Sequence, residues 1–448
     1  MKTTLTQTQT TVFNKVVDQI KYNLRTPYGM ESIKSRLISL SGAAGVGKSF
    51  LVAQITKQLV IELNSLPNQN GGDNSICITA PTHRAVQVVA EMVKAQQIAI
   101  ECKTLHSFLG LLQIYDNDTG EERYIINRNI VNPPQATILI VDESSMVSKS
   151  LFNFILEAVQ TGRVNTVLFV GDAYQLPPVQ EVESLVFRLK QNELTEIVRQ
   201  AQDSDIIKLA TRFRDGIATQ NFINLYDNFD NIQSKDIEIF TDSTLFLQDF
   251  CKNDQWYHEN KIISSYSNND VDSFNEAIRS YYWNTQGVVN PAYILPNDKL
   301  RFKKSFNVNS YQNGEEVIVK TATLLYDESL GISYWKCSVL GRDDFFVVDP
   351  ASRYRFQSIV ESYKQEALEQ EPHKRKKYWQ EYYKLKDSFA DVQYIFSSTI
   401  HKLQGSTYDI AYIDLKSFAN YWMISDNMKY RLAYVAITRA KHKVKILL

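Results

Sequence analysis

The sequence predicts an α/β fold with a doubly wound parallel sheet, because three apolar segments each run into a polar loop. Residues 37–41 precede a glycine-rich loop, residues 136–141 precede two acidic residues, and residues 164–170 precede a Gly-Asp turn. Such apolar runs are typical of strands buried on both faces, and helical patterns separate them. Ligands of these sheets bind at the carboxyl ends of the strands, where the three loops are expected.

The first loop, residues 42–49 ("GAAGVGKS"), fits the pattern GxxxxGK[ST] in full. Its glycines let backbone N–H groups turn inward around phosphate oxygens, and the following helix adds partial positive charge. Lys48 is expected to reach the β and γ phosphates, and the Ser49 hydroxyl to ligate Mg²⁺. The expected phosphate-binding residues are Gly42, Ala43, Ala44, Gly45, Val46, Gly47, Lys48 and Ser49. The loop therefore predicts a site for a nucleoside triphosphate with Mg²⁺.

The other two loops supply candidate catalytic groups. Asp142 can hold Mg²⁺ through water, and Glu143 can orient or deprotonate the attacking water. Gln175 lies in "GDAYQLPPV", where an amide can contact the γ-phosphate or the water and so register whether that phosphate is present. Together with Lys48, these residues form a predicted centre for hydrolysis of the nucleotide.

Further segments complete an ordered set of motifs. In chain order they are "GAAGVGKS", "APTHRA", "TLHSFL", "VDESSM", "GDAYQLPPV", "LTEIVRQ", "SSTIHKLQGST" and "YVAITRA". The set resembles superfamily 1B helicases, in the RecD and Dda branch, which moves 5′ to 3′ on DNA. The resemblance covers nearly the full chain, although residues 293–390 carry no sharp motif. It implies two RecA-like P-loop NTPase domains, ATP as the nucleotide, and DNA helicase activity.

The resemblance also assigns residues to the ATP site. Gln9 matches the glutamine that reads the adenine edge, and Gln404 and Gly405 are expected beside the nucleotide. Arg199 and Arg439 match two arginines that the second domain extends across the cleft. An arginine finger of this kind is worth about 10³ to 10⁵ in rate, so Arg439 is expected to tie hydrolysis to closure of the cleft.

The resemblance also implies a binding path for single-stranded DNA. Small hydroxyls and backbone N–H groups suit phosphate contacts that are made and released repeatedly without reading sequence. The expected DNA-binding residues are Pro81, Thr82, His83, Thr104, His106, Ser107, Asn268, Ser398, Thr399, His401 and Lys402. Asn275 matches a strand-contacting segment more loosely.

Residues 113–126 ("QIYDNDTGEERYII") predict a β-hairpin with its turn at 118–120, within an insertion at about 110–134. The insertion resembles the duplex-splitting pin of the family. Tyr124 or Tyr115 is the expected residue that stacks on the first base pair, and such stacking is worth about 1–3 kcal/mol.

The expected domain plan follows from these motifs. Residues 1–190 form the first RecA-like domain, and residues 191–292 with 391–448 form the second. Residues 293–390 are an insertion, expected as a small SH3-like β-barrel with a polar helical extension from residue 364 to residue 389.

Composition limits the remaining possibilities. The net charge is −1, so a shaped groove rather than bulk charge must bind a polyanion. No run of about 18 apolar residues and no signal peptide appear, and the four cysteines form no CxxC pair. The expectation is therefore a soluble cytoplasmic protein with free thiols, no membrane partner and no zinc site.

Three alternatives remain open from the sequence. A loader or switch ATPase of the AAA+ type would lack "GDAYQLPPV" and the late motifs. An RNA helicase of the same superfamily shares the ATP motifs, and a nucleic-acid-stimulated ATPase could remodel protein–DNA complexes without processive unwinding. The expected partners are single-stranded DNA and forked or tailed duplex DNA, with single-strand-binding or replication proteins as candidates, and the expected state is a monomer.

Overall fold

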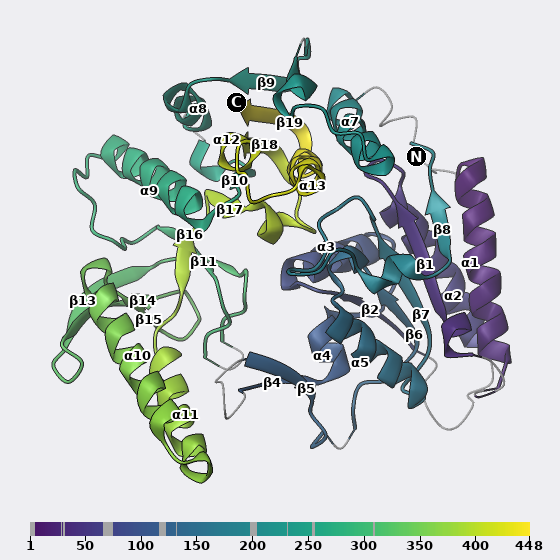
Figure 1. Ribbon diagram of the computed structural model, residues 1–448, viewed down its shortest axis with the longest axis horizontal. Coiled ribbons are helices and arrows are strands. Elements are labelled where there is room, and N and C mark those ends of the chain that lie inside the picture. The colour runs from purple at the N-terminus through teal and green to yellow at the C-terminus, as the bar shows by residue number, and fades with distance from the viewer. Residues whose placement is uncertain are drawn as a thin grey trace.

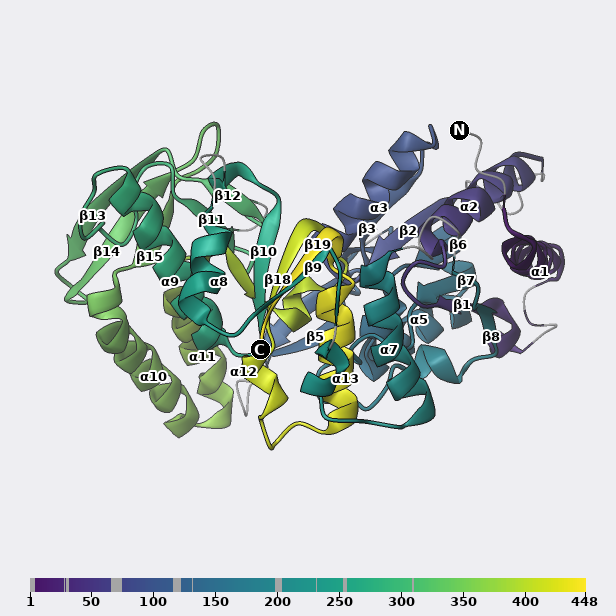
Figure 2. The same cartoon turned by 90° about the horizontal axis from the view of Figure 1, so that it is seen from above.

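The computed structural model contains two parallel sheets that lie side by side, with a smaller, mainly antiparallel segment attached to the second (Figures 1 and 2). The structure describes residues 5–27, 29, 32–65, 75–115, 122–130, 132–197, 204–230, 232–252, 256–307 and 310–448.

The first sheet has six strands in the order β3-β2-β6-β7-β1-β8, and all its neighbouring strands are parallel. Its strands are β1 (Leu37–Gly42), β2 (Ile76–Ala80), β3 (Glu101–Thr104), β6 (Ala136–Val141), β7 (Val164–Gly171) and β8 (Gln191–Leu194). Its helices are α1 (Gln7–Arg25), α2 (Lys48–Ser65), α3 (His83–Ala95), α4 (Leu105–Leu109) and α5 (Lys149–Gln160).

Alternate residues of these strands enter two separate cores. Ile138 and Ile140 of β6 pack with α1, α2 and α3, whereas Leu139 and Val141 pack with α4 and α5. Successive side chains of a strand point to opposite faces, so both faces of the sheet are covered by helices. The predicted doubly wound α/β architecture is confirmed for this part of the chain.

The second sheet has five parallel strands in the order β17-β10-β18-β19-β9. Its strands are β9 (Ile237–Phe240), β10 (Lys261–Ser265), β17 (Ser397–Thr399), β18 (Tyr408–Asp414) and β19 (Ala440–Leu447). Its helices are α7 (Asp205–Thr219), α8 (Ser243–Phe250), α9 (Asn268–Thr285), α12 (Lys416–Ala419) and α13 (Asp426–Ile437). This sheet is also double-sided, because Ile413 packs with α7 and α13 and Tyr412 packs with α8.

One boundary differs from the expected plan. β8 pairs with β1, so the first sheet continues to Leu194 rather than ending before residue 191. The Asn192 side chain donates to the Ser39 carbonyl at 3.0 Å, which fixes this strand to the sheet edge.

The inserted segment and β16, which follows residue 391, together form two antiparallel sheets of three strands each. One sheet contains β11 (Lys299–Phe302), β12 (Glu316–Ile318) and β16 (Val392–Tyr394), and the other contains β13 (Thr321–Asp327), β14 (Ile332–Ser338) and β15 (Phe345–Val348). The helical extension is a pair of helices, α10 (Arg353–Glu369) and α11 (Pro372–Lys386). Pro372 occupies the first turn of α11, where its missing N–H leaves no helical bond unmade.

The hairpin expected between the third and fourth motifs, "TLHSFL" and "VDESSM", is present as two strands. β4 (Leu111–Tyr115) and β5 (Glu122–Ile126) pair antiparallel, with Gln113 opposite Tyr124. The predicted turn at 118–120 lies outside the described residues, as does the Tyr115 side chain.

Two composition-based expectations can be compared with the structure. All four cysteines carry free thiols. Across the part of the chain that the structure describes, no helix is both long and apolar enough to cross a membrane.

Candidate nucleotide site and nucleic-acid interface

A cavity of about 700 Å³ lies between the two sheets and takes its walls from both. On the first sheet, residues of the 42–49 loop line it together with Gln9, Asp142, Glu143 and Gln175. On the second sheet, Gly405, Thr407, Thr438 and Arg439 line it. Most of the residues expected at the nucleotide are therefore brought together.

The 42–49 loop has the backbone shape that its glycines allow. Gly45 and Gly47 have φ of 82° and 78°, a region that residues with a β-carbon rarely adopt. The Lys48 ammonium donates to the carbonyls of Gly42 at 2.5 Å and Ala43 at 2.8 Å. It also lies 3.9 Å from a carboxylate oxygen of Asp172. Lys48 is therefore folded against its own loop.

The two acidic residues share one end of β6. Desolvation, reinforced by the charge of Glu143 and opposed by that of Lys48, raises the pKa of Asp142 to about 7. A desolvated carboxylate beside a second acidic residue is stabilised by a cation. Glu143 adopts the left-handed region, with φ of 49° and ψ of 43°, which is uncommon for a residue with a side chain.

Two glutamines line the first-sheet side of the cavity. The buried Oε1 of Gln175 has no hydrogen-bond partner in the structure, so an acceptor stands free at the cavity wall. Gln9 donates to the Val46 carbonyl at 3.0 Å and accepts from the Thr6 N–H at 3.1 Å. One N–H and one lone pair of the Gln9 amide remain beyond these two bonds.

Arg439 lies at the cavity but is held by its own half of the molecule. Its guanidinium donates to the carbonyls of Val435 at 3.0 Å and Ser406 at 3.2 Å, and only 7% of the residue is exposed. The other predicted arginine, Arg199, lies outside the described residues.

The motif "SSTIHKLQGST", which contains Gln404 and Gly405, also joins the second sheet to the first. The Gln404 amide donates to the Leu176 carbonyl at 3.2 Å. Gly405 approaches so closely that a β-carbon there would lie 2.9 Å from the Ala85 β-carbon.

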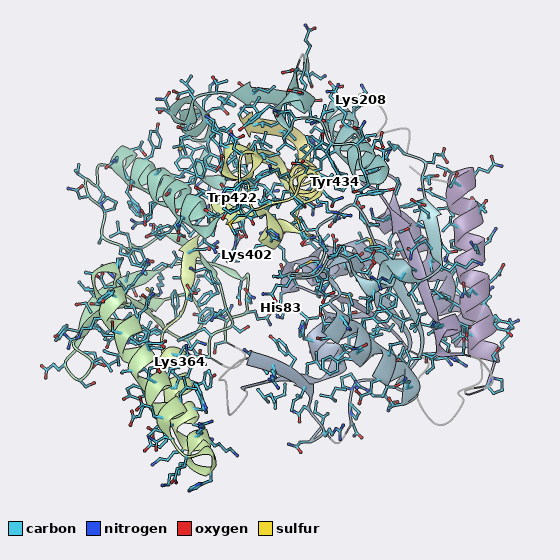
Figure 3. All side chains as sticks on the ribbon, viewed as in Figure 1. His83, Lys208, Lys364, Lys402, Trp422 and Tyr434 are labelled. Carbon is cyan, nitrogen blue, oxygen red and sulfur yellow. The ribbon has the colours of Figure 1, made fainter. Side chains whose placement is uncertain are left out.

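Sequence reasoning missed two residues of α13 that join the sheets. The Tyr434 hydroxyl accepts from the Ala44 N–H at 2.8 Å and donates to Asp172 at 2.6 Å. Arg431 donates to the carbonyls of Ala173 and Gln175, each at 2.6 Å. Tyr434, labelled in Figure 3, stands in the quoted motif "YVAITRA", so its presence there was the available signal.

The residues expected to bind DNA gather at the carboxyl ends of neighbouring strands. In the first sheet they follow β2 and β3, and in the second they follow β10 or lie on and after β17. They are Pro81, Thr82, His83, Thr104, His106, Ser107, Asn268, Ser398, Thr399, His401 and Lys402. In each sheet these strands lie toward one edge, beside the strands whose ends form the nucleotide cavity.

Several of these side chains also have a structural role. The hydroxyls of Thr82 and Thr104 accept the N–H groups of Ala85 and Ser107, and so cap α3 and α4. Each threonine hydroxyl keeps its own hydrogen for another acceptor. Asn275 is 1% exposed and bonds to both the N–H and the carbonyl of Ser397, so it anchors β17 to α9.

Other residues that are expected to bind DNA have polar groups that could contact a ligand. Ser107, Asn268 and Lys402 are exposed. The Ser398 hydroxyl is buried without a hydrogen-bond partner. Desolvation and the charge of Lys303 lower the pKa of Lys402, because two like charges lie close together.

A second cavity, of about 840 Å³, lies where the two sheets and the inserted segment meet. His83 and Arg84 line it from the first sheet, Thr407 and Lys441 from the second, and Glu316 from the insertion. Figure 3 shows His83 and Lys402 near the centre of the molecule.

Comparison with known proteins agrees with this geometry. A family model described as an AAA domain matches residues 30–236, and a UvrD-like helicase C-terminal domain matches residues 394–447. The ATP-dependent DNA helicase dda of Enterobacteria phage T4 is 25% identical, with 98% of each chain covered. The ATP-dependent RecD2 DNA helicase of Deinococcus radiodurans is 30% identical over 39% of this chain and 21% of its own length.

The fold is shared with a helicase of known structure. A Bacteroides Pif1 helicase in complex with ADP-AlF3 and single-stranded DNA aligns over 99% of this chain and 92% of its own, at 15% identity and a TM-score of 0.51. That likeness supports RecA-like α/β P-loop domains in this protein. In its ordered motifs, its two-sided nucleotide cavity and its full-length similarity to dda, the chain resembles the superfamily 1B DNA helicases of the RecD and Dda branch.

Proposed function

We propose that this protein uses ATP hydrolysis to move 5′ to 3′ along single-stranded DNA and to separate duplex DNA ahead of it. The observation that carries the proposal is the nucleotide cavity, which takes Lys48 from one sheet and Arg439 from the other. A nucleotide bound there contacts both halves, so its binding and hydrolysis change how the halves are held together.

The residues of the first sheet fit a magnesium-bound triphosphate. Ser49 and Asp142 would hold Mg²⁺, which would supply positive charge to offset that of the phosphates. The described residues contain no cluster of three or more His, Cys, Asp or Glu side chains suited to a metal ion. Magnesium in such sites keeps waters and phosphate oxygens as ligands, so one carboxylate and one hydroxyl are sufficient.

The other residues of the cavity are assigned to the hydrolytic step. Glu143 accepts the proton of the attacking water, while the free Oε1 of Gln175 orients that water by accepting its second hydrogen. Lys48 leaves its loop carbonyls for the phosphates. Arg439 turns part of its guanidinium to the phosphates across the cleft, and Gln9 offers its remaining N–H and lone pair to the adenine edge.

The DNA lies across both sheets in this proposal. Polar residues at the ends of β2 and β3 hold one part of the strand, and those at β10 and β17 hold the next. Because hydrolysis changes the spacing of the sheets, the two sets of contacts advance alternately. The β4-β5 hairpin is the proposed pin, and residues 293–390 are the proposed SH3-like insertion between residues 292 and 391.

Unwinding of tailed duplexes tests the proposal. Duplexes with a 5′ tail should be separated in the presence of Mg·ATP, and duplexes with a 3′ tail should not. ATPase stimulation by single-stranded DNA should exceed stimulation by RNA of the same sequence. If RNA stimulated the ATPase more than DNA did, the protein would be an RNA helicase. If DNA stimulated the ATPase without any strand separation, the protein would instead remodel protein–DNA complexes.

A further inference from the structure

Tyr434 joins the phosphate-binding loop to the loop that carries Gln175. Its hydroxyl accepts the Ala44 N–H at 2.8 Å and donates to the Asp172 carboxylate at 2.6 Å. The residue is 1% exposed, and burial together with the charge of Asp172 raises its pKa well above the usual range. The phenol therefore stays protonated, and its single hydrogen is committed to Asp172.

The Ala44 N–H belongs to the loop that is expected to bind phosphate. Ala44 lines the nucleotide cavity, in a loop whose N–H groups are expected to face phosphate oxygens. Here its N–H is satisfied by a side chain of the second sheet. A phosphate oxygen that takes this N–H would release the Tyr434 hydroxyl from the loop.

Asp172 connects the same hydroxyl to the catalytic residues. One of its oxygens lies 3.9 Å from the Lys48 ammonium, and the other accepts the Tyr174 N–H at 3.0 Å. The carboxylate is therefore fixed between the phosphate-binding lysine and the turn that leads to Gln175.

Helix α13, which contains Tyr434, also positions Arg431 and Arg439 near the cavity. Arg431, three residues earlier on α13, donates to the carbonyls of Ala173 and Gln175 at 2.6 Å. Arg439 lies two residues after the last residue of the helix, Ile437. A small shift of α13 on the 171–178 loop would therefore move Arg439 and Gln175 relative to the phosphates.

We propose that Tyr434 is a positioning residue for hydrolysis, whose hydroxyl sets the placement of α13 against the nucleotide and reports occupancy of the phosphate loop to the second sheet. This inference rests on the proposed ATPase function. It assigns Tyr434 no contact with the reacting atoms. Its effect runs through Ala44, Asp172 and the placement of Arg439.

Tyr434→Phe removes the hydroxyl and keeps the buried ring. The matched control is Tyr430→Phe, one helical turn away, because Tyr430 is 2% exposed and its hydroxyl bonds to Ile223 and Asn228 within the second sheet's own core. Each variant loses one buried hydroxyl from α13, but only Tyr434 reaches the phosphate loop.

Both variants are compared with the wild type for Mg·ATP affinity, for turnover with saturating ATP and single-stranded DNA, and for thermal stability. Tyr434→Phe should bind ATP no more than about three-fold more weakly, yet turn it over about ten-fold more slowly, as loss of transition-state placement predicts. Tyr430→Phe should lose stability and keep its turnover. Normal turnover in Tyr434→Phe, or equal losses in both variants, would overturn the inference.

A fluorine label tests the same point in a protein with an intact hydroxyl. With 3-fluorotyrosine at position 434, Mg·ADP with beryllium fluoride should shift the ¹⁹F resonance, whereas the label at position 430 should not respond. An unchanged signal at 434 would overturn the inference even if Tyr434→Phe did not fold. Absence of DNA stimulation in the wild type would instead count against the helicase proposal, since nucleotide binding and basal hydrolysis still report on Tyr434.

Discussion

The imidazole of His106 packs against the phenol of Tyr124, with the ring centroids 4.9 Å apart and the planes at 58°. This contact joins a residue expected on the DNA track to a residue of the β4-β5 hairpin. Burial, with a contribution from the charge of His83, lowers the pKa of His106, so this ring is neutral at pH 7. The hairpin is therefore supported by an apolar ring contact at the end of β3, beside the expected path of the strand.

Tyr124→Ala should impair strand separation more than ATP hydrolysis. Tyr124 is 46% exposed, and stacking of a base on an aromatic ring is worth about 1–3 kcal/mol, so the change removes a stacking surface together with the ring contact to His106. Tyr124→Phe should unwind normally. The measurement is base pairs separated per ATP hydrolysed on a 5′-tailed duplex.

The control for Tyr124 is Ile125→Ala, the next residue of β5, which is 43% exposed. Neighbouring residues of a strand point to opposite faces, so Ile125→Ala should keep normal coupling. Equal coupling in Tyr124→Ala and the wild type would place the pin on another residue.

Lys48→Ala should abolish DNA-stimulated ATP hydrolysis and leave the fold intact. Lys48 bonds to two carbonyls of its own loop and is absent from the apolar cores, so it contributes mainly charge for the phosphates. Lys57→Ala, an exposed lysine of the same helix, should keep full activity. Residual turnover near the wild-type rate would remove Lys48 from the phosphate site.

Arg439→Ala should still bind ATP but hydrolyse it slower by about 10³ to 10⁵, the range that arginine fingers supply. Single-turnover hydrolysis and nucleotide affinity are measured with saturating single-stranded DNA. Arg439→Lys should rescue poorly, because a point charge cannot replace a planar fork of donors.

Arg439→Ala also carries a stability effect, since its guanidinium satisfies the buried carbonyls of Val435 and Ser406. The loss should amount to about 1–3 kcal/mol in the free energy of unfolding. Lys443→Ala, an exposed cation on β19, should affect neither property. Hydrolysis by folded Arg439→Ala at close to the normal rate would assign this arginine a purely structural role.

Gly405→Ala should slow ATP turnover by holding the two sheets apart. A β-carbon at Gly405 would meet the Ala85 β-carbon at 2.9 Å and the Glu143 side chain at 3.6 Å. Gly314→Ala is the control, because Gly314 has φ of 83°, close to the 73° of Gly405, but has open space around its α-carbon. Both variants carry the backbone strain of about 1–2 kcal/mol, and only Gly405→Ala should lower turnover. Equal turnover would show that the close approach does not limit cleft closure.

The first sheet and its phosphate loop could be predicted because their signals are local. The spacing of Gly42, Gly47 and Lys48 specifies a loop, and the apolar runs around it specify buried strands. The bonds of Tyr434 and Arg431 gave no such signal, because their partners lie more than 250 residues away in the chain. Only the folded arrangement shows which carbonyl or N–H each side chain meets.

Local patterns were also weaker at segment boundaries. β8 is four residues long and Leu194 is its only apolar residue, so its pairing with β1 depends on the sheet rather than on its own hydrophobic pattern. Asn275 was loosely matched to a DNA-contacting segment, and its polar side chain was compatible with that role. The structure instead commits that amide to the backbone of Ser397, because β17 needs a partner on its α9 side.

The order of strands in the second sheet has a consequence for how the protein is made. β10 lies between β17 and β18, and β9 pairs only with β19, so every partner of these early strands follows the insertion in the chain. During synthesis on the ribosome the first sheet can fold early, but the apolar residues of β10 pair with β17 and β18 only after the chain has been made beyond Ser397. Premature termination within that portion would leave the second sheet incomplete, with exposed strand edges that expose the polypeptide to aggregation.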